Sequence, residues 1–164
     1  MYFLSVVSAF GPEYGQIEPH QAGQSEESLK GQLFVPSDRG RLVSVKLDLA
    51  ATAEFLGVIE KGCFVRNPYH NVMHTVDVMQ AMLTLLMATT CPDFFSAQEL
   101  QAGLIAAAIH DYEYPGVDSS FLVNIRHPMA IRYSDSAILE NHHVAAAFAL
   151  LSDMDVNPMA NYSE

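Results

Sequence analysis

A short segment in the first half of the chain carries histidine and aspartate at a spacing suited to chemistry. Pro68 fits the first turn of a helix, because its missing N–H needs no partner there. A helix that begins at Pro68 would place His70, His74 and Asp77 on one face, at positions i, i+4 and i+7. The opposite face would carry apolar side chains, namely Val72, Val76, Met79, Leu83 and Leu86. These two faces predict a helix that packs on one side and contributes to a site on the other.

A second segment ends in two ionisable side chains beside an apolar helix. Residues 97–110 are rich in alanine and leucine and nearly free of charge, and Ser96 and Glu99 stand at the two positions of a capping box. We therefore expect a central, buried helix that runs directly into His110 and Asp111. Burying these two groups costs several kcal/mol unless they are paired or bind a metal.

Taken together, the two segments predict a metal site. Imidazole nitrogens and a carboxylate oxygen suit Zn²⁺ or a similar divalent ion. Each segment alone has a simpler interpretation, because HxxxH is more often two partly exposed histidines and His-Asp can be an ordinary helix end. Two such segments on separate helices favour a metal-assisted hydrolase, without naming its substrate.

The elements that must position these groups are expected to be helical. Further helices are predicted over residues 43–62, 118–124, 130–133 and 136–151. The first of them takes its spacing from Val45, Leu49, Leu56 and Ile59, and Gly62 can end it. No long segment alternates with period two and no β-hairpin signal is present, so we predict an all-α multi-helix bundle. Residues 1–42 are interpreted as a tail or linker, and residues 43–164 as the helical domain.

Composition excludes several classes of function. The chain has 164 residues, of which 50% are hydrophobic and 16% charged, as expected for one domain with a core. A net charge of -11 opposes binding to nucleic acid or anionic membranes. No apolar run approaches the roughly 20 residues that span a bilayer, and residues 1–10 lack the positive charge of a signal peptide. Cys63 and Cys91 are interpreted as reduced thiols, so a cytoplasmic protein is expected.

Three ordered motifs resemble the catalytic domain of class I cyclic-nucleotide phosphodiesterases, which belong to the HD-type metal-dependent phosphohydrolases. The motifs are NPYHNxxHxxDVxQ at 67–80, HDxxxPGxxxxFL at 110–122 and AxxYxDxxxLENHH at 130–143. The likeness runs from about Leu47 to about Leu151. It implies a helical bundle of the phosphodiesterase type.

The resemblance also implies roles for individual residues. His70 would protonate the departing 3′ oxygen. His74, His110 and Asp111 would bind a first metal, usually Zn²⁺, and Asp111 would bridge to a second, Mg²⁺ or Mn²⁺. A hydroxide held between the two metals would attack phosphorus in line. Glu140 would orient water in the outer shell, and the other residues expected in the outer shell or near the substrate are Tyr69, Asn71, Asp77, Tyr114 and His143.

The implied activity is hydrolysis of a 3′,5′-cyclic nucleotide, cAMP or cGMP, to the 5′-monophosphate in cyclic-nucleotide signalling. Two alternatives stay open: a helical binding or dimerisation module that kept the scaffold without activity, and an HD-type hydrolase of another phosphate ester. The bound cations would supply the positive charge that an acidic protein lacks at a phosphate site.

The chain departs from the family pattern at three positions and in length. Tyr114 stands where the second motif usually has histidine, and Ser119 and Ser134 stand where asparagine is usual. The family domain continues well beyond residue 164, and that part resembles the source of a fourth metal ligand and of the glutamine that binds the purine. We therefore expect a truncated domain with at most three ligands to the first metal. Its helix faces should be left uncovered, which favours self-association.

Overall fold

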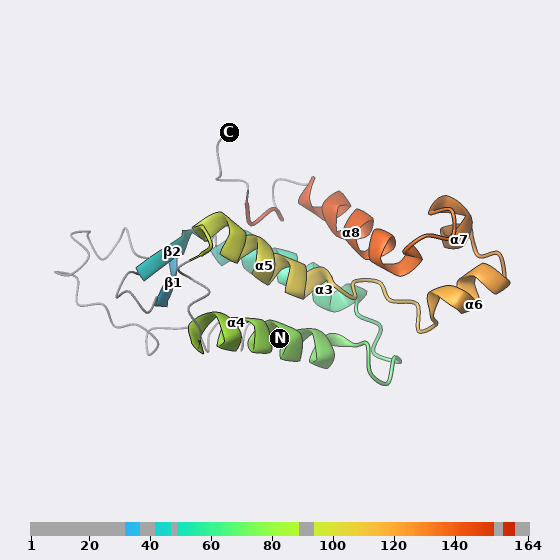
Figure 1. Ribbon diagram of the computed structural model, residues 1–164, viewed down its shortest axis with the longest axis horizontal. Helices are drawn as coiled ribbons and strands as arrows, with labels where there is room; N and C mark the ends of the chain where they lie inside the picture. Colours follow the sequence, from blue (N-terminus) through green and yellow to red (C-terminus); the bar gives the residue numbers. More distant parts are fainter. Residues whose placement is uncertain (1–31, 37–41, 47–48, 89–93, 153–155, 160–164) are drawn as a thin grey trace.

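The described residues form six helices and one two-stranded sheet. The computed structural model describes residues 32–36, 42–46, 49–88, 94–152 and 156–159 (Figure 1). In chain order the elements are β1 (Gln32–Pro36), β2 (Leu42–Lys46), α3 (Leu49–Gly62), α4 (Val72–Ala88), α5 (Ala97–Ile109), α6 (Ser119–Asn124), α7 (Pro128–Arg132) and α8 (Ile138–Leu151). None of the described helices combines the length and the apolar character needed to cross a membrane. The predicted helical fold class is confirmed.

The strands β1 and β2 form an antiparallel hairpin that the sequence analysis did not expect. Gln32 pairs with Lys46 and Pro36 with Leu42. Each strand has five residues, which is too short for a period of two to be distinguished from a short apolar run. Val45, predicted in the first helix, therefore lies in β2. The expected boundary between residues 42 and 43 falls inside this strand, and the division into tail and domain stays a prediction; residues 1–31 lie outside the described part.

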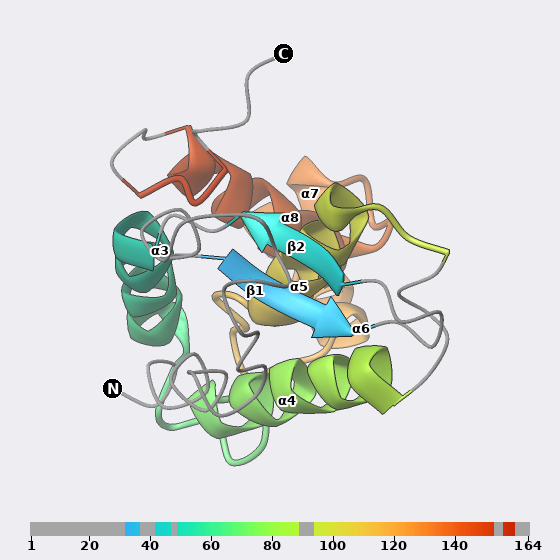
Figure 2. The ribbon, with the colours of Figure 1, turned by 90° about the vertical axis from the view of Figure 1, so that its left-hand side faces the viewer.

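Helix α5 lies at the centre of the fold. It contacts α3, α4, α8 and β2, and Figure 2 shows the hairpin crossing over it, with α4 on one side and α3 on the other. Phe55 and Ile59 of α3 and Met79 of α4 belong to the same buried cluster as Ala108 of α5. The predicted apolar face of α4 is confirmed, because Leu83 and Leu86 are buried as well.

Local capping explains where α5 begins. The Ser96 hydroxyl accepts from the backbone N–H of Glu99 at 3.3 Å, and the Glu99 carboxylate accepts from the backbone N–H of Ser96 at 2.8 Å. This is the predicted capping box. Helix α3 ends at Gly62 as expected, and a side chain at this position would overlap the ring of Tyr112.

Helix α4 begins four residues later than predicted. Asn71 starts it, because its side-chain oxygen accepts from the backbone N–H of Met73 at 3.0 Å. The segment from Pro68 to Asn71 forms turns rather than the first helical turn, so His70 precedes the helix. The prediction that His70 and His74 share one face of a helix is therefore wrong, because only His74 lies in α4. The two side chains still meet, as described below.

Helix α8 begins at a strained residue. The predicted start at residue 136 is two residues early, because Ala137 occupies the helix N-cap with φ 43° and makes no capping hydrogen bond. This left-handed region is unfavourable for a residue with a Cβ. Ser134 and Asp135, in the same connection from α7, also have positive φ, at 51° and 57°.

Ala137→Gly should therefore stabilise the chain. We expect the free energy of unfolding to rise by about 0.5–1 kcal/mol, because glycine adopts the left-handed region without steric cost. The matched control is Ala145→Gly, in the exposed middle of the same helix, which should lower it by about 0.5–1 kcal/mol. Urea unfolding of both variants measures the difference, and changes of the same sign would contradict this interpretation.

Candidate metal centre

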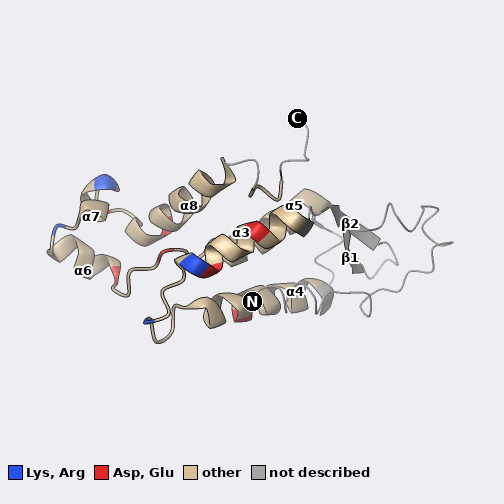
Figure 3. Ribbon diagram, turned by 180° about the vertical axis from the view of Figure 1, so that it is seen from behind, with Lys and Arg blue, Asp and Glu red and all other residues tan. Residues whose placement is uncertain are grey.

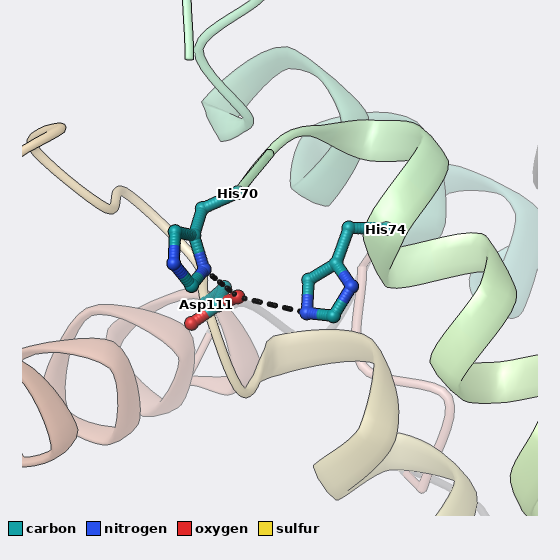
Figure 4. A group of neighbouring side chains, drawn as sticks. All are labelled: His70, His74 and Asp111. Carbon is teal, nitrogen blue, oxygen red and sulfur yellow. Dashed lines mark hydrogen bonds and ion pairs between the residues drawn. The ribbon is translucent and has the colours of Figure 1, made fainter. Parts of the chain in front are cut away.

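Three histidine side chains, from the beginning of α4 and the end of α5, converge on one carboxylate oxygen. Asp111 Oδ2 lies 2.8 Å from His70 Nδ1, 3.4 Å from His74 Nε2 and 3.1 Å from His110 Nε2. Figure 4 shows the rings of His70 and His74 approaching Asp111 from opposite sides. His110 caps the end of α5, and Asp111 follows it directly. The structure thus brings together the four residues to which the sequence analysis assigned metal or catalytic roles.

Hydrogen bonding and burial set the protonation of two of these rings. His110 Nδ1–H donates to the carbonyl of Ala107 at 2.9 Å, which leaves Nε2 to face the cluster with its lone pair. Burial lowers the pKa of His74 below its ordinary value, and the neighbouring His110 lowers it further, while Asp111 opposes the shift. The His74 ring is therefore neutral at pH 7.

This donor set fits a divalent cation. The Nε2 atoms of His74 and His110 lie 3.2 Å apart, and both lie within 3.4 Å of Asp111 Oδ2. Ligand atoms at about 2.0–2.1 Å from a tetrahedral ion are separated by about 3.3–3.4 Å. His70, His74 and Asp111 also offer three ligand atoms within 4.8 Å of one another. Lone pairs held this close repel each other unless a proton or a cation lies between them, so a metal ion matches the geometry.

Two asparagines connect the turn that carries His70 to the loop after α5. Asn67 Nδ2 donates to the carbonyl of Tyr114 at 3.0 Å, and Asn71 Nδ2 donates to the carbonyl of Asn67 at 2.9 Å. Gly116, with φ 84°, approaches Asn67 so closely that a Cβ would lie 2.7 Å from its Oδ1. The sequence analysis gave Asn67 no role, although it belongs to the quoted motif.

Three of the expected outer residues contact or border the cluster through aromatic rings. The ring of Tyr69 lies 4.4 Å from that of His74, and the ring of Tyr114 lies 4.2 Å from that of His70, measured between centroids. His143 is buried beyond Tyr114, at a centroid distance of 6.2 Å. These positions place Tyr69 and Tyr114 next to the candidate ligands and His143 behind Tyr114.

Two other expected residues lie near the cluster without direct bonds to it. Asp77 and Glu140 are exposed, and within the described ranges neither forms a hydrogen bond or ion pair with the four converging side chains. The sequence analysis missed a nearby ion pair, in which His142 Nε2 lies 2.9 Å from Glu113 Oε2 and joins the loop after α5 to α8. Its only sequence signal is the pair of histidines at 142 and 143.

His143 should make the stability of the chain depend on pH. Its Nδ1–H donates to the carbonyl of Tyr112, and burial lowers the pKa of its ring below 6.5. The His143 ring therefore binds a proton more readily in the unfolded chain than in the folded chain. Its contribution to stability is complete above pH 6.5 and is lost as the pH falls below that value.

His143→Asn should weaken this dependence, since asparagine keeps an N–H for Tyr112 and takes up no proton. We expect the free energy of unfolding to fall less steeply between pH 6.5 and about 5 than it does in the unchanged chain. Urea unfolding at a series of pH values measures both slopes, and equal slopes would contradict the assignment.

Comparisons with known proteins match this geometry to one family. The family model described as 3′5′-cyclic nucleotide phosphodiesterase matches residues 69–164. The probable 3′,5′-cyclic-AMP phosphodiesterase pde-4 of Caenorhabditis elegans is 41% identical over 97 residues, which are 59% of this chain and 14% of that protein. The dual specificity calcium/calmodulin-dependent 3′,5′-cyclic nucleotide phosphodiesterase 1C of Mus musculus is 39% identical over 121 residues, 73% of this chain and 17% of that protein.

A solved structure agrees. The phosphodiesterase domain of the RhoPDE fusion protein from the choanoflagellate Salpingoeca rosetta superposes with a TM-score of 0.68 at 33% identity, over 72% of this chain and 37% of that one. The chain thus spans a small part of the curated relatives and just over a third of a solved domain. It belongs to the 3′,5′-cyclic nucleotide phosphodiesterase family.

Proposed function

We propose that this protein hydrolyses 3′,5′-cyclic nucleotides, cAMP or cGMP, to 5′-nucleoside monophosphates in cyclic-nucleotide signalling. The observation that carries the proposal is the convergence of three histidines on Asp111 Oδ2 within 3.4 Å, in a chain of the phosphodiesterase family. We also propose a cytoplasmic location, which the free thiol of Cys63 supports.

The candidate ligands suit two divalent ions, with Zn²⁺ at the first position. His74 Nε2, His110 Nε2 and Asp111 Oδ2 would hold it, since neutral imidazoles and a carboxylate are ligands that zinc favours. The second oxygen of Asp111 would contribute to a position for Mg²⁺ or Mn²⁺, which favour oxygen ligands. When bound, such ions supply electrophilic activation of the phosphodiester and of the attacking water.

His70 is suited to deliver a proton to the leaving 3′ oxygen. Its Nδ1–H donates to Asp111 at 2.8 Å, so the carboxylate fixes the tautomer and orients the ring. Its second ring nitrogen points away from Asp111 in Figure 4. The side chain is 37% exposed, which leaves this nitrogen accessible to a bound ester.

The surrounding residues would support this chemistry from outside. Asn71 fixes the turn that carries His70, and Tyr69 covers the ring of His74. Burial lowers the pKa of His74 and of His143, and the negative charges of Asp77 and Glu140 respectively oppose part of that lowering. In the proposed site these carboxylates would orient water or the histidine rings at longer range.

Loss of a metal ligand should abolish both metal binding and turnover. After dialysis against metal-free buffer, we expect elemental analysis to find about one Zn²⁺ per unchanged chain, held by three protein ligands, and little in His74→Ala or Asp111→Ala. Hydrolysis of cAMP and cGMP should fall by about a hundredfold or more in both variants. The matched control is His127→Asn, which keeps a side-chain acceptor at the N-cap of α7, outside the cluster.

The same assays separate the alternatives. Unchanged cyclic-nucleotide hydrolysis in Asp111→Ala would refute the proposed site. Stoichiometric nucleotide binding without turnover under any divalent metal would indicate a binding module. Turnover of other phosphate esters alone, in a substrate panel, would indicate an HD-type hydrolase of a different specificity.

We also propose that the chain self-associates through exposed apolar side chains of α8. Val144 and Phe148 lie one turn apart and are 51% and 57% exposed, and Figure 3 shows few charged residues on this helix. Burying two such side chains against a second copy would remove apolar surface from water.

Light scattering after size-exclusion chromatography should therefore show a molar mass that increases with protein concentration. Phe148→Glu should shift this increase to higher concentration, because it places a charge on the apolar face. A concentration-independent monomer would contradict the proposal. Glu140→Gln, on the same helix and exposed, serves as the control for a change of charge alone.

A further inference from the structure

Tyr114 packs its ring against the ring of His70. The two centroids are 4.2 Å apart and the planes are inclined by 31°, so the rings contact in a tilted face-to-face arrangement. The phosphodiesterase motif that this chain resembles usually has histidine at this position. Tyrosine keeps a hydroxyl but has no imidazole nitrogen, so its role at this position needs an explanation of its own.

The backbone holds Tyr114 in place from two directions. Its N–H donates to the carbonyl of Asp111 at 3.1 Å, and its carbonyl accepts from Asn67 Nδ2 at 3.0 Å. The first contact ties Tyr114 to the backbone of Asp111, whose side chain lies at the centre of the cluster. The second ties it to the turn that carries His70. The backbone of Tyr114 is therefore held at both its N–H and its carbonyl.

The Tyr114 ring also lies near a second, anchored histidine ring. His143 lies at a centroid distance of 6.2 Å and an inclination of 33°. It is 3% exposed, and its Nδ1–H donates to the carbonyl of Tyr112. Burial and the nearby Asp111 raise the pKa of the Tyr114 hydroxyl, so the ring is neutral. Tyr114 thus has two histidine rings as neighbours, one buried and one more exposed.

His70 needs such support more than the other cluster histidines. It lies in a turn, before α4 begins, and its side chain is 37% exposed, against 31% for His110 and 16% for His74. One hydrogen bond to Asp111 limits the position of Nδ1 but leaves the ring free to tilt about that bond. The rings of Tyr69 and His74 both meet His70 edge-on, at 5.0 Å and 82° and at 5.6 Å and 88° respectively. The face of Tyr114 is therefore the surface that can fix the plane of the ring.

We propose that Tyr114 is a positioning residue that holds the His70 ring with Nδ1 toward Asp111 and Nε2 toward the leaving oxygen. The contact between the two rings is seen in the structure and does not depend on the proposed function. Its kinetic consequence rests on the proposed function, in which His70 is the proton donor. The role differs from an outer-shell contact to the second metal, because it uses the face of the ring and not the hydroxyl.

The first test is nuclear magnetic resonance of the metal-free 164-residue chain with isotopically labelled histidine and tyrosine. We expect nuclear Overhauser contacts between the ring protons of His70 and Tyr114, and upfield shifts of the His70 protons that lie over the tyrosine face. Tyr114→Phe should keep these shifts, while Tyr114→Leu should remove them. Their absence from the unchanged chain would overturn the proposal without any substitution.

The second test is steady-state hydrolysis of cAMP and cGMP by the same variants. Tyr114→Leu should lower kcat about tenfold and change KM less than about twofold, because a misaligned proton donor affects the chemical step and not ground-state binding. Tyr114→Phe should recover most of the lost kcat. If the kcat of Tyr114→His equals that of the unchanged chain while Tyr114→Phe is as slow as Tyr114→Leu, a hydrogen bond rather than the ring face matters. The proposal is then overturned.

The two tests distinguish failure of the positioning role from failure of the proposed function. An inactive unchanged chain that shows the ring contacts, lost in Tyr114→Leu, would reject the proposed function and keep the positioning of His70. If the unchanged chain is active and Tyr114→Leu alters neither kcat nor the His70 resonances, the positioning role is rejected and the proposed function stands.

Discussion

The carboxylate of Asp111 is the constraint on which the arrangement of the site depends. One of its oxygens lies within 3.4 Å of three imidazole nitrogens, a density of acceptors and lone pairs that requires protons or a cation to be stable. Groups placed so closely must be held by their backbone. The chain achieves this by packing α4 against α5 and by hydrogen-bonding the preceding turn to the following loop through Asn67.

Much of the helical scaffold could be predicted because its signals are local. The capping box of Ser96 and Glu99 lies within four residues, and the apolar stripe of α4 repeats at the helical period. Asp118 caps α6 by accepting from the N–H of Phe121, again within a few positions. The association of His74, His110 and Asp111 could be expected for a different reason, since two chemically unusual segments on buried helices favour a common site.

Features that depend on distant partners or on one side chain escaped prediction. The bond from Asn67 to Tyr114 spans 47 positions, and the pair of Glu113 and His142 spans 29. Neither leaves a periodic trace in the sequence. The start of α4 was misplaced because Asn71 caps the helix, whereas Pro68 merely permits a helical turn. The hairpin of β1 and β2 was missed because its strands are too short to show alternation.

The directions of α4 and α5 have a consequence that no side chain determines. His70 and His74 lie where α4 begins, while His110 and Asp111 lie where α5 ends. Figure 1 shows the start of α4 and the end of α5 on the same side of this pair of helices. Aligned peptide dipoles give a helix about half a positive charge at its start and half a negative charge at its end. Backbone polarity therefore favours a cation beside α5 and an anionic phosphate beside α4, in the same small space.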